Sequence, residues 1–218
     1  MTIKEEIIKY IKINRVSTTE VADCLGKTGV IPDVLPMNKQ LFAVGEVFWV
    51  YAYNESNWDI HEQIRCVPEN SIVLIEAFNC GERALIGELV SKYILLYRQA
   101  VAMVVIGKMR DAHKLIKDRY PIWCSGVSPV GCFNIKNTEP FDNEILLDRQ
   151  KKYNGAIAVC DDSGVVIIPP ECITWDFYQK LEFIEEQEDI WFECIDKRKW
   201  DTFDTVCLKK YKENQKEV

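Results

Sequence analysis

Residues 87–111 constrain the fold of this chain more than any other stretch. They open with Gly-Glu-Leu-Val and then place apolar side chains at three- and four-residue steps, at Leu89, Tyr93, Leu96 and Tyr97. That spacing predicts an amphipathic helix over about 88–98, with Gly87 just before its first turn. The β-branched run that follows, 101–106, is short and apolar, which is typical of a parallel strand buried on both faces. A helix followed by such a strand predicts an α/β fold.

The start of this helix is a candidate anion site. The backbone N–H groups of Leu89 and Val90 fall in the first turn, where a helix leaves its donors without intrahelical acceptors. Together with the helix dipole, such donors attract a carboxylate or a phosphate. Gly87 and these two N–H groups are therefore candidate substrate-binding groups.

The end of the strand is a candidate metal and substrate site. Gly107 is expected to end the strand, so that Lys108, Arg110 and Asp111 lie at its carboxyl end, where open α/β sheets bind ligands. A guanidinium binds a carboxylate through two parallel hydrogen bonds, whereas an adjacent carboxylate repels that anion unless a cation lies between them. Arg110 and Asp111 thus predict an anionic substrate beside a divalent metal. A structural alternative is equally open, in which Asp111 is the N-cap of the next helix.

The remaining segments extend the alternation of strands and helices. We expect helices over 3–13 and from a Ser17–Glu20 capping box to about 25, strands at 42–53, 71–78 and 121–126, a helix opening near 57 and a short helix at 111–117. Residues 134–153 predict a loop or an edge strand, and 155–170 a hairpin in which Asp161 and Asp162 form the turn, with a metal role for these two as the alternative. The β-α-β-α-β order from 71 to 126 predicts a parallel-sheet core.

Composition excludes several classes of protein. The chain has 218 residues, a net charge of −7 and a pI near 5.1, which argues against a nucleic-acid surface. The nine cysteines form no C-x-x-C pair and suit reduced thiols in a cytosol. We find neither a signal peptide nor a membrane-spanning run, so we expect a cytoplasmic protein. The two histidines are too few for an imidazole metal centre, and His61 is expected to be structural or to line a pocket.

A long acidic helix is expected from Thr174. Its apolar stripe contains Phe177, Leu181, Ile184, Trp191 and Ile195, and Glu188 fills the vacant place in that stripe. The Glu188 carboxylate either extends to solvent or a lysine, or enters a site on a neighbouring subunit. Residues 209–218 predict a frayed tail.

Six segments, taken in order, resemble the RraA family, which includes the regulator of ribonuclease E activity and the 4-hydroxy-4-methyl-2-oxoglutarate aldolases. They lie between about residues 16 and 170: S-T-T-E-V-A-D-C-L-G-K-T-G-V-I-P, N-W-D-I-H, G-E-L-V, V-V-I-G-K-M-R-D, P-I-W-C-S-G-V-S-P-V-G and A-V-C-D-D-S-G-V-V-I-I-P. The resemblance implies a swivelling β/β/α, phosphohistidine-domain-like fold over 1–170, with N-terminal helices within 3–30. A helical extension over 171–218 would pack on the domain or on a neighbouring subunit. The resemblance also implies a homotrimer or hexamer with active sites between subunits.

The resemblance further implies residue roles. Arg110 would bind the pyruvyl group of a small 2-oxo acid, and the N–H groups of Leu89 and Val90 its carboxylate. Asp111 would ligate Mg²⁺ or Mn²⁺, while Glu88 and a neighbouring subunit's Glu188 would act on the metal through water.

The implied activity is that of a class II pyruvate aldolase that also decarboxylates oxaloacetate. The regulator type lacks the aspartate after the arginine, so Asp111 favours an enzyme. Lys114, however, stands where the aldolase signature has an acid. The alternatives are a non-catalytic regulator that binds a ribonuclease, a Schiff-base route through Lys108 or Lys114, and a menaquinone methyltransferase. The sequence shows no glycine-rich strand-helix turn that would hold S-adenosylmethionine, which argues against the methyltransferase.

Overall fold

One mixed sheet forms the centre of the molecule. The computed structural model describes residues 2–214, and within them eight strands form a sheet in the order β1-β6-β5-β3-β2-β7-β8, with β4 beside β5. The strands are β1 (Leu35–Pro36), β2 (Ala43–Tyr53), β3 (Ile72–Phe78), β4 (Ala84–Ile86), β5 (Ala102–Met109), β6 (Ile122–Val127), β7 (Ile157–Asp161) and β8 (Gly164–Ile168). The pairs β2·β3, β3·β5 and β5·β6 are parallel, which confirms the predicted parallel core.

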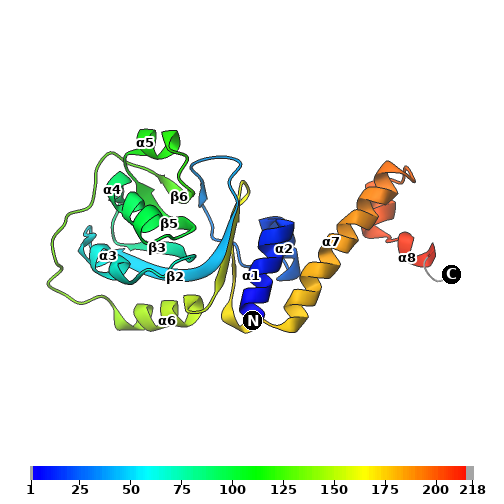
Figure 1. The fold of residues 1–218 in the computed structure, drawn as a ribbon, viewed down its shortest axis with the longest axis horizontal. Helices are drawn as coiled ribbons and strands as arrows, with labels where there is room; N and C mark the ends of the chain where they lie inside the picture. The colour runs from blue at the N-terminus through cyan, green and yellow to red at the C-terminus, as the bar shows by residue number, and fades with distance from the viewer. Residues whose placement is uncertain (1, 215–218) are drawn as a thin grey trace.

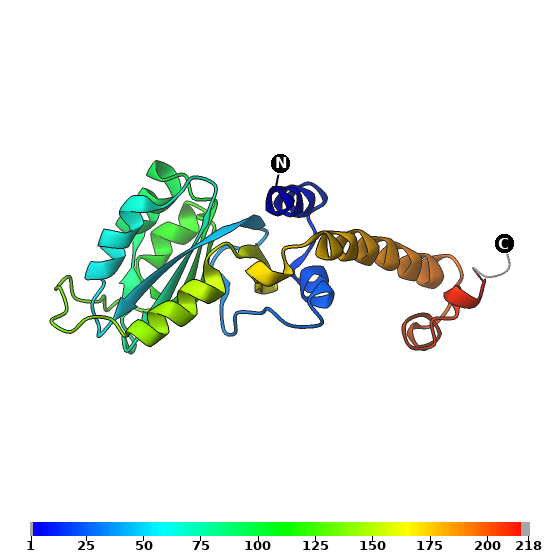
Figure 2. The same cartoon turned by 90° about the horizontal axis from the view of Figure 1, so that it is seen from below.

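Helices surround this sheet and extend away from it (Figures 1 and 2). They are α1 (Ile3–Asn14), α2 (Thr18–Cys24), α3 (Trp58–Gln63), α4 (Glu88–Lys92), α5 (Ala112–Lys117), α6 (Asn143–Tyr153), α7 (Trp175–Asp196) and α8 (Tyr211–Asn214), with short 3-10 turns at Ile64–Cys66 and Pro170–Cys172 and π-helical segments at Tyr93–Tyr97 and Phe203–Cys207. None of these helices combines the length and apolar character that crossing a bilayer requires. The predicted division of the chain into a domain over 1–170 and a helical extension over 171–218 stays a prediction.

Strong local signals place the N-terminal helices and the hairpin. At α2, Ser17 Oγ accepts from the Glu20 N–H at 3.2 Å while Glu20 Oε2 accepts from the Ser17 N–H at 2.6 Å, which is the predicted capping box. The antiparallel pair β7·β8 is the predicted hairpin, and Asp162 lies in its turn. Asp161, at the end of β7, accepts hydrogen bonds from Thr18 at 2.7 and 2.8 Å, so this carboxylate links the hairpin to α2.

Four predictions need correction. Gly107 does not end its strand, because β5 continues through its pairing with β6 to Met109. Residues 143–153 are helix α6, whose N-cap Asp142 accepts from the Glu144 and Ile145 N–H groups at 2.8 and 3.2 Å. The expected frayed tail is helical at Tyr211–Asn214, and Tyr211 is buried; residues 215–218 lie outside the described part of the chain. Asp111 does not cap α5 with its side chain.

The apolar stripe that predicted α4 faces solvent instead of the core. The exposed fractions are 79% for Leu89, 56% for Leu96 and 68% for Tyr97. The helix buries Ile94 and Leu95 instead, and its second half is π-helical, which changes the face that each residue presents. The described chain therefore carries an uncovered apolar surface beside the start of α4.

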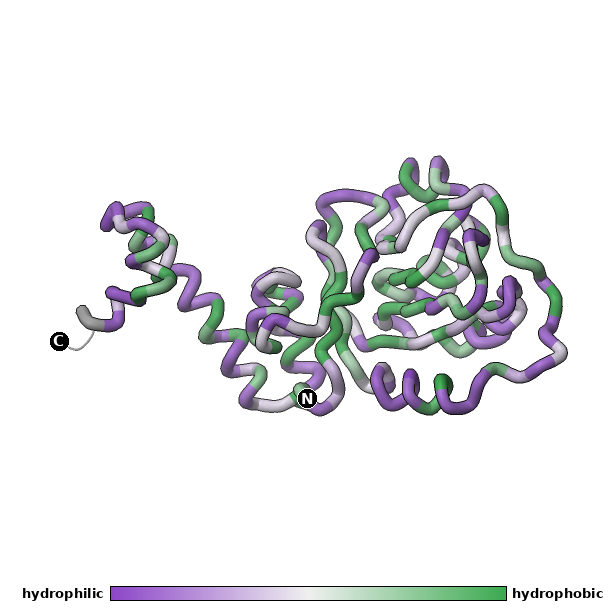
Figure 3. The backbone as a smooth tube through the Cα atoms, turned by 180° about the vertical axis from the view of Figure 1, so that it is seen from behind, coloured by the Kyte–Doolittle hydropathy of each residue, from purple (hydrophilic) through white to green (hydrophobic). Residues whose placement is uncertain are grey.

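Hydrophobic residues are concentrated in the strands of the sheet, as the green segments of the backbone in Figure 3 show. The parallel strands are buried on both faces: Ile75 and Val105 pack on one side, Leu74 and Val104 on the other. A third cluster joins α1 and α2 to the hairpin and to the first half of α7, where Phe177 and Leu181 are buried. Ile184, Trp191 and Ile195 of the predicted stripe are only partly covered.

Candidate active site

A small cavity of about 110 Å³ lies where β4 and β5 end. The strand β4 runs directly into Gly87 and α4, and the strand β5 runs directly into Arg110. The lining residues are Asn57, His61, Ala84, Leu85, Ile86, Gly87, Leu89, Val90, Arg110, Gly131, Cys132 and Asn134. The structure thus brings together Gly87, Leu89, Val90 and Arg110, which the sequence predicted as substrate-binding residues.

Gly87 lets the two chain segments approach closely. The Arg110 N–H donates to the carbonyl of Ile86 at 3.0 Å, which fixes the start of α4 against the end of β5. A Cβ atom at Gly87 would lie 2.2 Å from Asp111 Oδ2 and 2.6 Å from Arg110 Cγ. Only glycine therefore fits between α4 and this Arg-Asp pair.

Asp111 lies beside Arg110, but only Arg110 is among the residues that line the cavity. Asp111 has a left-handed backbone (φ 60°), and its Oδ2 accepts the N–H of Glu88 at 3.0 Å. This carboxylate therefore caps α4, not the helix that follows it. Arg110 Nε lies 3.7 Å from the same oxygen, and both side chains remain about half exposed, which leaves them accessible to a ligand.

Glu88 is paired with the lysine that departs from the aldolase signature. Lys114 Nζ lies 2.7 Å from Glu88 Oε2, and this hydrogen bond raises the pKa of Lys114. Because the ion pair lies on the exposed side of the site, its stabilising effect is small. The ion pair matters more for the chemistry of the site, because the Lys114 ammonium neutralises Glu88, a carboxylate that was expected to act on a metal.

Asn57 is a pocket residue that the sequence reasoning did not select. It is 8% exposed, and its Nδ2 donates to the carbonyl of Leu85 at 2.8 Å. Its Oδ1 is buried without a hydrogen-bond partner, which is costly unless a ligand or water supplies a donor. Within the same N-W-D-I-H segment, His61 lines the cavity, in agreement with one of its two expected roles, and Asp59 does not.

The donor chemistry at Asp111 fits a hydrated divalent cation. No three His, Cys, Asp or Glu side chains within residues 2–214 are grouped so as to enclose a metal. Mg²⁺ keeps several waters and binds proteins through one or two carboxylates, so Asp111, with one carboxylate oxygen outside the Glu88 hydrogen bond, suits it. Glu88 would contribute through water once it leaves Lys114.

Glu188 does not join this site within one chain. It lies on α7, on the far side of the sheet from α4 and α5 (Figure 1). Burial and the neighbouring acids Glu20 and Asp23 raise the pKa of Glu188, so its own chain gives it an acidic environment. Its predicted role on a neighbouring subunit stays a prediction.

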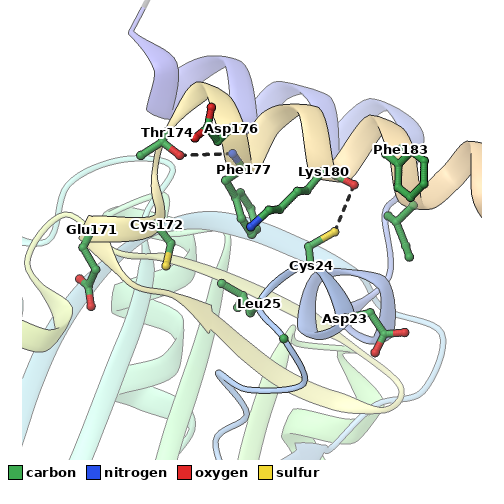
Figure 4. Close-up of a pocket in the computed structure, with 12 residues that line it drawn as sticks. Asp23, Cys24, Leu25, Glu171, Cys172, Thr174, Asp176, Phe177, Lys180 and Phe183 are labelled. Atoms are coloured by element: carbon green, nitrogen blue, oxygen red, sulfur yellow. Dashed lines mark hydrogen bonds between the residues drawn. The ribbon is translucent and has the colours of Figure 1, made fainter.

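A second, larger pocket of about 700 Å³ lies between α2 and the start of α7 (Figure 4). In it, the Cys24 thiol donates to the carbonyl of Lys180 at 3.4 Å. Burial and the nearby acids Asp23 and Glu20 raise the pKa of Cys24 to about 11, which keeps this thiol protonated. The pocket shares no lining residue with the Arg110 cavity.

The fold and this site define a mixed α/β protein with a small pocket, lined by Arg110, at the carboxyl ends of the parallel strands β4 and β5. Residues 18–167 match the family model described as RraA-like: Aldolase/RraA, and the chain belongs to that family. The family includes both aldolases and non-catalytic ribonuclease E inhibitors, and some of its members use a divalent metal.

Three relatives illustrate the similarity. An uncharacterised protein from Pseudomonas syringae pv. tomato has a TM-score of 0.71 at 20% identity, covering 94% of each chain. Streptomyces coelicolor RraAS2, described as an unusual member of the RNase ES inhibitor RraA family, has a TM-score of 0.64 at 17% identity, covering 84% of this chain and 96% of its own. Protein DlpA of Legionella pneumophila is 20% identical over 171 residues, which are 74% of this chain but 27% of DlpA. The chain thus spans about a quarter of that curated relative, and the likenesses support the RraA fold.

Proposed function

We propose that this chain is a divalent-metal-dependent lyase that cleaves a 4-hydroxy-2-oxo acid, such as 4-hydroxy-4-methyl-2-oxoglutarate, to pyruvate and also decarboxylates oxaloacetate. The cavity supports this most directly, because Arg110, the first turn of α4 and the unpartnered Asn57 Oδ1 line the same small space. A cavity of about 110 Å³ is small, which suits the pyruvyl end of a compact oxo acid.

The chain's own residues would orient and stabilise the substrate. The carboxylate would accept the N–H groups of Leu89 and Val90, and Arg110 would bind the pyruvyl oxygens. As the C–C bond breaks, the keto oxygen of the substrate becomes the enolate oxygen of pyruvate. The guanidinium stabilises that negative charge, and this stabilisation lowers the barrier. Decarboxylation of oxaloacetate gives the same enolate, so one site would serve both reactions.

Asp111 would hold Mg²⁺ or Mn²⁺, with Glu88 and a neighbouring chain's Glu188 acting through water. When bound, the cation would polarise the keto group as a Lewis acid. For the cleavage reaction, water oriented by Glu88 and Asp111 would accept the proton of the 4-hydroxyl group. Gly87 supports both roles because it lets Asp111 and Arg110 approach the start of α4.

We also propose that the active unit is a homotrimer or a hexamer. Leu89 lines the cavity, and the exposed side chains of Leu89, Leu96 and Tyr97 are the kind of surface that a second copy would bury. A neighbouring chain there would close the mouth of the pocket and could bring Glu188 to it.

A second candidate is a non-catalytic regulator that binds a ribonuclease. The specific observation in its favour is the Lys114–Glu88 pair, which places an ammonium 2.7 Å from a carboxylate that the aldolase mechanism needs. A permanent pair would leave Asp111 as the single carboxylate available to a cation.

The two candidates are separated by pyruvate release from oxaloacetate. We expect activity with Mg²⁺ above the metal-only background, its loss with chelator, and its loss in Asp111→Asn. Asp118→Asn, at the opposite end of α5 from Asp111, is the matched control. Activity that is unchanged by both the chelator and Asp111→Asn would contradict the metal-dependent lyase. The absence of any activity would contradict it too and would favour the regulator.

A further inference from the structure

Two cysteines meet at the wall of the candidate active site. Cys80 follows β3 and begins a turn in which the Arg83 N–H donates to the Cys80 carbonyl at 3.2 Å. Cys132 lies beside β4, and its N–H donates to the carbonyl of Ala84 at 2.9 Å. Although 52 positions separate them, Cys132 packs against the buried cluster that contains Cys80, and each thiol shifts the pKa of the other, that of Cys80 downward and that of Cys132 upward.

The backbone holds these two segments together through one shared residue. The N–H of Glu55 donates to the carbonyl of Asn79 at 3.1 Å, and the carbonyl of Glu55 accepts from Phe133 at 2.8 Å. The residues next to Cys80 and Cys132 are thus both tied to Glu55. The thiol contact is fixed by this network and not by a flexible loop.

The two thiols differ in their access to solvent. Cys80 is 3% exposed, whereas Cys132 is only partly buried and lines the cavity with Arg110. A small hydrophilic oxidant that enters the cavity would therefore reach the Cys132 sulfur, with the Cys80 sulfur directly behind it. This is the arrangement of an attacking thiol with a resolving thiol.

We propose that Cys80 and Cys132 form a reversible disulfide when a hydroperoxide enters the cavity. The Cys132 sulfur attacks one peroxide oxygen and the O–O bond breaks, giving a Cys132 sulfenic acid and, after protonation, water. The Cys80 sulfur then attacks the Cys132 sulfur and the S–O bond breaks, releasing a second water. The balance is two thiols and one H₂O₂ giving one disulfide and two waters, and two thiol equivalents of a dithiol reductant reverse it.

The pair can supply a thiolate at neutral pH, but the attacking thiol of Cys132 must pass its proton to Cys80. The neighbouring Cys132 thiol lowers the pKa of Cys80 to about 7, while the Cys80 thiol raises the pKa of Cys132. The pair thus loses its first proton near neutral pH and holds the second. As the Cys132 sulfur attacks, its proton passes to the Cys80 thiolate. Arg83, whose Nη1 donates to the Gly131 carbonyl at 3.1 Å, adds a positive charge that favours a thiolate, and Glu55, 3.1 Å from Arg83, opposes it.

Oxidation of the two cysteines would change the position of the cavity wall next to Arg110. Gly131, next to Cys132, approaches Arg110 so closely that a Cβ there would lie 3.0 Å from Nη1. A disulfide draws Cys132 toward Cys80, so the Gly131 wall moves relative to the guanidinium. This disulfide can form whether or not the chain is a lyase.

Peptide mapping tests the proposal on the full-length protein. Trypsin would place Cys80 in a peptide of residues 66–83 and Cys132 in one of residues 120–136, and each peptide holds one other cysteine, Cys66 or Cys124. After brief treatment with H₂O₂, we expect these two peptides to be joined, with a mass lower by two hydrogens than their sum, and to separate again in dithiothreitol.

The second cysteines supply matched controls. Cys80→Ser and Cys132→Ser should each abolish the joined peptide, whereas Cys66→Ser and Cys124→Ser should keep it. A joined peptide that is lost in Cys66→Ser or Cys124→Ser, or oxidation of Cys132 to sulfinic acid with Cys80 still reduced, would overturn the proposal. Circular dichroism of each variant shows that it folds.

Discussion

The carboxylate of Asp111 accepts the backbone N–H of Glu88 at 3.0 Å, across 23 positions of the chain. This bond joins the end of β5 to the start of α4 and places Arg110 beside the same helix terminus. The site therefore depends on one tertiary contact that helix, strand and turn propensities do not contain. Gly87, directly before Glu88, makes the contact sterically feasible because it has no Cβ to meet Asp111.

Arg110→Ala should abolish most of the pyruvate release. The guanidinium is the group proposed to stabilise the enolate charge, and removing such a group typically costs about a hundredfold or more in kcat. The half-exposed side chain leaves no core cavity when truncated, so thermal stability should change little. Arg119→Ala, an arginine outside the cavity, should retain activity. Equal losses in the two variants would contradict the role of Arg110.

Gly87→Ala should inactivate the protein more severely than Gly131→Ala. The new Cβ at position 87 would meet Asp111 Oδ2 at 2.2 Å and Arg110 Cγ at 2.6 Å, so both side chains must move. At position 131 the contact is with the flexible end of Arg110 at 3.0 Å, which can shift. Steady-state kinetics of both variants checks this order, and the reverse order would refute the geometry.

Lys114→Gln should lower the Mg²⁺ concentration needed for half-maximal activity by several-fold. The ammonium that neutralises Glu88 is removed, so both acids become available to a cation. The shift should also appear in direct Mg²⁺ titration by calorimetry. Lys117→Gln, on the same helix, is the control and should bind Mg²⁺ as the unmodified chain does. An unchanged Mg²⁺ requirement in Lys114→Gln would mean that this ion pair does not compete with the metal.

Tyr97→Glu should dissociate the assembly. The side chain is 68% exposed in the isolated chain, on the surface proposed to contact a second copy. Light scattering should give a mass of three or six 25.3 kDa chains for the unmodified protein and one chain for the variant. Leu147→Glu, 58% exposed on α6, should keep the full mass. A mass of one chain for the unmodified protein would contradict the proposed homotrimer or hexamer.

Asp59→Asn should stabilise the protein at pH 7. Burial raises the pKa of Asp59 above its usual 3.8, and its Oδ2 is buried without a partner. Between the unfolded pKa of Asp59 and its higher folded pKa, the folded state binds more protons than the unfolded state. The free energy of unfolding therefore falls as the pH rises through this range. The neutral amide avoids that loss, so the thermal midpoint should rise at pH 7 and the gain should vanish below pH 3.8. Each 1 kcal/mol corresponds to about 2–4 °C for a chain of this size.

Glu69→Gln is the control for that comparison, because Glu69 is exposed. Its thermal midpoint should follow that of the unmodified chain at both pH values. A destabilised Asp59→Asn at pH 7 would show that the carboxylate has a favourable partner in solution.

The sequence by itself determined the elements and the family. Local spacing placed the capping box at Ser17, the buried strands and the hairpin, because each depends on neighbours a few positions away. The ordered motifs were sufficient to identify the RraA-like family. Local signals failed where a helix has weak periodicity, as at 143–153.

The tertiary structure alone decided which groups share the cavity. Asn57 lies 53 positions before Arg110, and Cys80 lies 52 before Cys132, so no local pattern relates either pair. It also decided that Leu89 and Tyr97 face outward, because the direction of a helix face depends on what the sheet can accept. Periodicity specifies that a helix has an apolar side; only the packing of the whole chain specifies whether that side is already covered.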